Sequence, residues 1–143
     1  MSPEDFDALE RELGFSLPPY YRETLLNYPF GEGSVAQENE LTDSLTDLLE
    51  MNAPEGREGM DLGVLERPFF IGDDCGEERY LIDAAARDSR VYVYQLEADR
   101  CTGLCANWEA YLEGIRKSDA DIAEDERLMA ELEATKKWWQ FWR

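Results

Sequence analysis

The sequence of 143 residues contains no histidine. This absence excludes Ser-His-Asp and Cys-His nucleophile pairs, His-ligated zinc or iron sites, and an imidazole proton shuttle. Any catalysis would depend on carboxylates, Lys, Tyr or Cys, and the sequence shows no convincing arrangement of these groups. We therefore expect a protein that is not an enzyme and that uses no metal or other cofactor.

Positive charge is also scarce. The chain carries 14 Lys and Arg residues against 33 Asp and Glu residues, so its formal net charge at pH 7 is -19. Such a charge repels nucleic-acid phosphates and anionic membranes, and it attracts cationic surfaces. No apolar run approaches the roughly 20 residues that cross a bilayer. We expect neither a nucleic acid nor a membrane as partner.

The first residues and the number of cysteines bear on location. Residues 1–5 are acidic where a secretory signal would be basic and then apolar. Three cysteines, an odd number, indicate reduced thiols rather than disulfides. These features predict a cytoplasmic protein.

The thiols of Cys75, Cys101 and Cys105 raise the alternative of a zinc site. Cys101 and Cys105 would lie one turn apart on a helix, but no paired C-x-x-C motif and no histidine completes the ligand set. Free cysteines are more often small buried apolar residues. We favour that interpretation and expect no metal site.

Helical signals dominate the N-terminal part of the chain. Ser2 is a plausible N-cap, Asp5 completes a capping box with it, and Gly14 ends the helix. A second helix is expected over residues 19–28, after a proline-rich corner, so the two helices should form a hairpin. Leucine spacing predicts a short third helix within residues 41–53.

The middle of the chain changes to short β-branched and aromatic runs bounded by turn residues. Three strands are expected at residues 68–71, 79–83 and 90–94. The connection over 72–78 has hairpin composition, with glycines where a positive φ is needed. In the third strand valines alternate with tyrosines, so both faces of the sheet should be at least half covered.

Helical spacing returns from Leu104 to Ile115, and Ser118 is expected to cap a final helix. One face of that helix is formed by Leu128, Leu132, Thr135 and Trp139. Helices, then antiparallel strands, then helices predict an α+β fold. We expect an N-terminal helical hairpin, a central antiparallel β-sheet and C-terminal helices packed on the sheet.

The densest group of carboxylates beside glycines is Asp73, Asp74, Glu77 and Glu78. Neighbouring carboxylates could serve acid/base hydrolysis or hold a divalent cation, although the alternate-position spacing of an EF-hand is absent. The favoured interpretation is a solvated hairpin tip whose aspartates hydrogen-bond to their own backbone. Such a tip presents negative charge to a partner without any catalytic geometry.

The negative charge is concentrated in the N-terminal half of the chain. Residues 1–67 carry 16 Asp and Glu against 4 Lys and Arg. An excess of this size steers a cationic partner into fast association. We therefore add three residues of the expected third helix to the candidate partner-binding residues, namely Asp43, Asp47 and Glu50.

The C-terminal tail, residues 136–143, combines three tryptophans and a phenylalanine with two lysines and an arginine. This composition occurs in nucleic-acid stacking and in membrane-interface binding, but both conflict with the net charge of -19. We expect the tail to pack either on the core or on another copy of the chain. A homodimer through the Trp-rich tail is therefore one expected assembly.

Four blocks of sequence, in order, resemble one protein family. Residues 6–28 combine a helix ending in Leu-Gly, a Leu-Pro corner and a Tyr-Arg-x-x-Leu-Leu run, and residues 70–83 form a glycine-rich strand-loop-strand. Residues 91–94 resemble the next strand, and residues 108–115 resemble the closing helix. Together these blocks resemble the SUKH superfamily, the Smi/Knr-type domain.

The resemblance covers residues 6–115 and implies an α+β domain with no known catalytic site. We expect one such domain over residues 1–143, with 118–143, which lies outside the resemblance, as a C-terminal helical extension. Many bacterial members look like immunity proteins that bind and neutralise a cognate polymorphic toxin, often a nuclease or a deaminase. A basic toxin suits the charge of this chain, so we expect neutralisation through an acidic surface. The alternative is a non-enzymatic regulatory adaptor that binds several cellular proteins.

Overall fold

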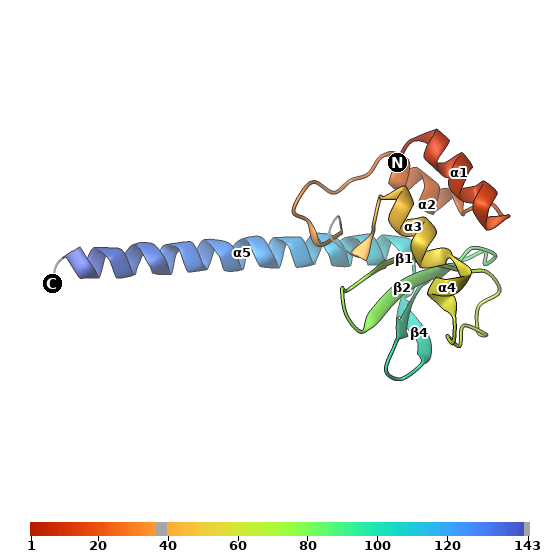
Figure 1. Cartoon of the computed structure of the whole chain (residues 1–143). Helices are drawn as coiled ribbons and strands as arrows, with labels where there is room; N and C mark the ends of the chain where they lie inside the picture. The colour runs from red at the N-terminus through yellow and green to blue at the C-terminus, as the bar shows by residue number, and fades with distance from the viewer. Residues whose placement is uncertain (37–39, 142–143) are drawn as a thin grey trace.

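The computed structural model describes residues 1–36 and 40–141. Its elements in chain order are α1 (Pro3–Leu13), α2 (Pro19–Leu26), α3 (Leu45–Asn52), α4 (Pro54–Arg57), β1 (Pro68–Asp73), β2 (Glu78–Asp83), β3 (Val91–Gln95), β4 (Arg100–Cys105) and α5 (Trp108–Phe141). Figure 1 shows α1 to α4 gathered with the sheet at one end of the molecule, while α5 extends far beyond them. The α+β fold predicted from the sequence is confirmed, with one long C-terminal helix in place of several.

The N-terminal hairpin has the caps that the sequence predicts. The Ser2 hydroxyl accepts a hydrogen bond from the Asp5 backbone N–H, and the Asp5 carboxylate accepts one from the Ser2 backbone N–H, both at 3.1 Å. Gly14 ends α1 with a φ of 80°, in the left-handed region that favours glycine. Arg22 of α2 forms an ion pair with Glu10 of α1 at 2.5 Å, which joins the two helices.

The sheet has four antiparallel strands in the order β1-β2-β3-β4, with a bulge in β1 between Phe70 and Gly72. The fourth strand is not among the predicted ones. The sequence pattern assigned Leu104 to the start of a helix, and this assignment is wrong, because residues 100–105 pair with β3. β4 contains Gly103 and little apolar alternation, so pairing with its neighbour rather than local preference keeps it extended.

Both faces of the sheet are buried, as the valine and tyrosine alternation in β3 predicts. Val91 and Val93 belong to the larger core, whereas Tyr94 lies in a smaller core on the other face. The larger core also includes Phe6, Leu9, Tyr21, Leu25, Leu48, Phe69, Ile71, Tyr80, Ile82, Trp108, Tyr111, Leu112 and Ile115. The buried residues of the smaller core are Leu65, Phe70, Leu81 and Tyr94. Burial of one such large side chain contributes roughly 1.5–3 kcal/mol.

Helix α5 continues without a break for 34 residues. The predicted boundary at Ser118 is wrong, because its hydroxyl donates to the Gly114 carbonyl at 3.0 Å within the helix instead of capping a new one. No proline interrupts α5, and most of its residues after Ser118 are good helix formers such as Ala, Glu, Leu and Lys. A single helix is the physical result.

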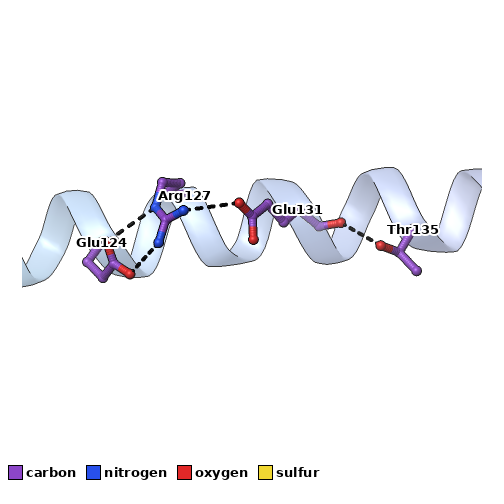
Figure 2. A network of polar contacts seen from close by, with 4 residues as sticks. All are labelled: Glu124, Arg127, Glu131 and Thr135. Carbon is purple, nitrogen blue, oxygen red and sulfur yellow. Dashed lines mark hydrogen bonds and ion pairs between the residues drawn. The ribbon is translucent and has the colours of Figure 1, made fainter.

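Only the first turns of α5 are buried. From residue 120 to residue 140 every side chain is exposed, and Figure 1 shows this part of the helix leaving the domain. Along it, Arg127 bonds to Glu124 and to Glu131 (Figure 2). The expectation that the tail packs on the core is therefore wrong for residues 136–140, whereas the side chain of Phe141 and residues 142 and 143 lie outside what the structure describes. In the part of the chain that the structure describes, no helix has both the length and the apolar character to cross a membrane.

The outer edge of β1 is closed by the side chain of Asn52, the last residue of α3. Its amide oxygen accepts from the Phe70 backbone N–H at 2.8 Å, and its amide nitrogen donates to the Phe70 carbonyl at 3.0 Å and the Leu48 carbonyl at 2.9 Å. Arg57 donates to the Asn52 amide oxygen and to the Pro68 carbonyl. A buried polar residue thus takes the place of a neighbouring strand at this edge.

We predict that Asn52→Ala lowers the free energy of unfolding by about 1–3 kcal/mol, because it leaves buried backbone groups of Phe70 without partners. Urea denaturation followed by circular dichroism measures the change. The control is Asn27→Ala, whose exposed side chain makes one bond to the Glu23 carbonyl and whose loss should cost less than about 0.5 kcal/mol. Equal effects of the two substitutions would contradict the role assigned to Asn52.

Candidate functional site

The loop between β1 and β2 is stabilised by its own aspartates. The Asp73 carboxylate accepts from the Cys75 backbone N–H at 2.9 Å. One carboxylate oxygen of Asp74 accepts from the backbone N–H groups of Gly76 and Glu78, at 2.9 and 3.0 Å. The loop therefore has the geometry of the expected solvated hairpin tip. The positive φ of 61° falls on Cys75, so the expectation that glycines take it is wrong.

Four carboxylates from three parts of the chain form what we call the acidic cluster. Its members are Glu40, Asp74, Glu78 and Asp119. Burial of Glu40, together with the charges of Asp119 and Asp74, raises the pKa of this carboxyl above its ordinary value of 4.5. Burial of Tyr80, followed by the charges of Glu40, Glu78 and Asp74, raises the pKa of that phenol. The carboxylates of the cluster thus act on two groups, the half-buried Glu40 carboxyl and the buried Tyr80 phenol.

Two hydrogen bonds of α5 position Glu40 and Asp119 within the cluster. The Tyr111 hydroxyl donates to the backbone carbonyl of Glu40. The Asp119 carboxylate accepts from the Val35 backbone N–H at 2.8 Å. Both contacts join α5 to the segment before α3, so the first turns of the helix bring Glu40 and Asp119 to the same place.

A hollow next to the cluster, which we call the acidic groove, separates the 31–34 segment from α5. It is lined by Gly31, Glu32, Gly33, Ser34, Asp119, Ile122, Ala123 and Glu126. Three of these residues are acidic, and Ile122 and Ala123 are apolar. A Lys or Arg side chain matches this combination, because it carries an apolar stem and a positive head.

A second acidic hollow lies beside the β1–β2 loop. It is lined by Glu77, Glu78, Gln95, Glu97 and Ala98. The Leu96 backbone N–H donates to the Glu77 carbonyl at 2.8 Å, which joins the turn after β3 to the loop. Through Glu78, this hollow continues from the acidic cluster.

The seven predicted binding residues fall into two groups. Asp73, Asp74, Glu77 and Glu78 lie together on the loop. Asp43 lies at the margin of the cluster, since burial of Tyr28 and then the charges of Asp43 and Asp119 raise the pKa of the Tyr28 phenol. Asp47 and Glu50 lie on the exposed side of α3, and no hydrogen bond or ion pair among the described residues joins them to the loop.

Sequence reasoning missed four acidic residues of this surface, namely Glu32, Glu40, Asp119 and Glu126. The 31–40 segment has little periodicity, and Asp119 belongs to the stretch assigned to a separate final helix. The carboxylates lie far apart in the sequence, and only the fold brings them together. The sequence shows only that these residues share a negative charge. Charge alone does not indicate that their side chains lie close together in the fold.

The cysteines do not form a common site. Cys101 packs against the smaller core and Cys105 against the larger one, on opposite faces of β4, so the predicted helical spacing of one turn is wrong. Burial raises the pKa of both thiols. Cys75 is exposed on the loop, which contradicts its interpretation as a buried apolar residue. Across residues 1–36 and 40–141, no group of three or more Cys, Asp or Glu residues is placed to hold a metal ion.

We predict that Glu40→Gln stabilises the protein at neutral pH. Because the folded-state pKa of Glu40 is raised, stability linked to this group is present below its ordinary pKa and is lost as the pH rises through the folded-state value. The variant avoids that loss. Because Glu40 is only half-buried, solvent screens these charges. The gain in the free energy of unfolding at pH 7 should therefore be only about 0.3 kcal/mol.

Urea denaturation of native protein and variant at a series of pH values tests this prediction. The difference should be present at pH 7 and vanish at acid pH. Glu12→Gln on the exposed side of α1 is the matched control, with no expected difference. A gain that is the same at all pH values would contradict the electrostatic explanation.

Comparison with known proteins identifies the family to which the chain belongs. The model of the SMI1 / KNR4 family (SUKH-1) matches residues 1–114, which include α1 to α4, all four strands and the start of α5. Searches of curated proteins and of solved structures give no significant match. Because the family model covers most of the chain, the protein belongs to the SMI1/KNR4 family (SUKH-1).

Proposed function

We propose that this chain is an immunity protein that binds a cognate polymorphic toxin in the cytoplasm and neutralises it through the acidic cluster and the adjoining acidic groove. The observation that carries the proposal is the convergence of Glu40, Asp74, Glu78 and Asp119 on one surface. Membership of the SUKH-1 family supports it. The chain acts by binding, as a stoichiometric inhibitor rather than as an enzyme.

The negative charge of this surface indicates which class of toxin it would bind. A nuclease or a deaminase that acts on nucleic acid needs positive charge to hold phosphates. An acidic surface competes for the same positive charge and can cover the cleft that carries it. The groove adds a place for one long cationic side chain between Ile122 and the carboxylates of Glu32 and Glu126.

Co-expression tests the function directly. The open reading frame beside the gene for this chain is expressed alone and together with it. We expect growth arrest in the first case, growth in the second, and a complex of the two proteins on purification. Absence of both toxicity and binding would overturn the proposal. A purification that returns several unrelated cellular proteins and no toxin would favour the regulatory adaptor.

The surface itself is tested by neutralising three of its charges. We predict that Asp74→Asn, Glu78→Gln and Asp119→Asn together slow association with the toxin about tenfold at low salt and flatten its salt dependence. The amide side chains keep the hydrogen-bond acceptors that the Asp74 and Asp119 backbone contacts need. Stopped-flow mixing at several salt concentrations gives the rates.

The matched control removes the same net charge elsewhere. Glu4, Glu12 and Glu23 are exposed on α1 and α2, and their replacement by Gln should change the association rate less than threefold by the same electrostatic reasoning. If both triple variants slow association equally, net charge alone steers the toxin. An unchanged rate in the first variant would place the interface on another face.

A further inference from the structure

The part of α5 beyond the domain carries a row of exposed apolar side chains. Five of them, 45–61% exposed, lie within one side of the helix, namely Ile122, Leu128, Met129, Leu132 and Trp139. A helix that contacts nothing over such a length usually carries a polar surface all round. Exposed apolar side chains in a contiguous row indicate a surface that another molecule covers.

The spacing of this row is that of a coiled coil. Ile122, Met129 and Lys136 follow one another at intervals of seven, and Asp125, Leu132 and Trp139 do so three residues later. These are the a and d positions of a heptad repeat, which meet a partner helix. We call these six positions the seam. Asp125 and Lys136 are its two charged members, and their charges are opposite.

We propose that two copies of this chain associate through the seam, with their α5 helices antiparallel. One register satisfies every seam position. It places Met129 opposite Leu132 of the second copy, Ile122 opposite Trp139, and Asp125 opposite Lys136, each pair occurring twice about the two-fold axis. A parallel pair would instead set each Asp125 against another Asp125 and each Lys136 against another Lys136. Charge complementarity therefore selects both the occupant and its direction.

The surface of α5 fits this register. A hollow on the helix is lined by Leu132, Thr135, Lys136, Trp139 and Gln140. In the antiparallel arrangement this hollow faces Asp125 of the second copy, so that its carboxylate lies beside the Lys136 ammonium. Insertion of one side chain into a hole formed by its partner helix is the packing mode of coiled coils.

The residues beside the seam differ on its two edges. On one edge, Leu128 lies near Thr135 of the second copy and extends the apolar contact. On the other edge, Glu126 lies between Glu133 and Lys137 of the second copy, so repulsion and attraction oppose each other there. The seam spans about 26 Å along each helix, a short coiled coil. We therefore expect weak association, so that the dimer forms only at high protein concentration.

Sedimentation equilibrium of the full chain over a concentration series tests the association. We expect a shift from the monomer mass of 16.5 kDa toward twice that mass as the concentration rises. Leu132→Glu should weaken dimerisation at least tenfold without affecting the fold, because Leu132 is exposed in the single chain. A native chain that stays monomeric into the millimolar range, or a Leu132→Glu variant that associates like the native chain, would overturn the proposal.

Charge exchange tests the direction of the helices. Asp125→Lys alone should weaken the dimer about tenfold, because each new lysine faces Lys136, and addition of Lys136→Asp should restore it to within a few-fold. Glu12→Lys on α1 makes the same change in charge outside α5 and should leave the dimer unchanged. A double variant that associates no better than Asp125→Lys alone would rule out the antiparallel register.

The seam shares Ile122 with the acidic groove, and Glu126 lies beside both, so the second copy and a toxin side chain compete for this part of α5. The two proposals are still tested by separate measurements. Toxin neutralisation is measured by growth and complex formation, whereas the seam is measured with the purified chain alone. A Leu132→Glu variant that is monomeric and still protects cells would separate the two.

Discussion

The packing of the first turns of α5 against the domain determines where both surfaces proposed to bind partners lie. Trp108 is held from two sides, because its indole N–H donates to the Thr24 hydroxyl at 2.9 Å and its backbone N–H donates to the Ser89 hydroxyl at 3.1 Å. Its ring also meets that of Tyr21, with centroids 5.8 Å apart. Once this end is fixed, the regular geometry of the helix fixes where Asp119 lies and in which direction the distal half leaves the domain.

The acidic cluster has an electrostatic cost that the core must offset. The pKa of Glu40 is raised because burial and the neighbouring charges of Asp119 and Asp74 disfavour its ionised form. A cationic group from a partner reduces this repulsion on binding. The same arrangement that weakens the free protein slightly therefore strengthens a complex with a basic surface, and it also attracts such a partner from a distance. Two buried cores, one on each face of the sheet, supply the stability that makes this arrangement tolerable.

Features with a local cause could be predicted from the sequence, and those with a tertiary cause could not. The capping box at Ser2 and the turn at Gly14 follow from neighbouring residues, and the two-sided burial of β3 follows from its alternation. β4 has no comparable local signal, since partner pairing makes it a strand. The assumed helix break failed because Ser118, a good capping residue elsewhere, bonds back to the preceding turn. The loop carboxylates were found by their density, whereas the contribution of Asp119 depends on where α5 docks.

Near residue 115, α5 changes from a helix that packs in the core to one whose side chains are exposed. The family match ends at residue 114, and Ile115 is the last buried side chain of the helix. The seam lies wholly beyond this point, so its residues can change without disturbing the sheet or either core. Burying Asp125 and Lys136 in an apolar seam costs affinity that two apolar residues would provide. Such charges are useful where they specify direction, because every wrong register leaves them unpaired. The distal half of α5 thus carries the contact proposed between copies, while the surface proposed for a basic partner lies on the domain and reaches α5 only as far as Glu126.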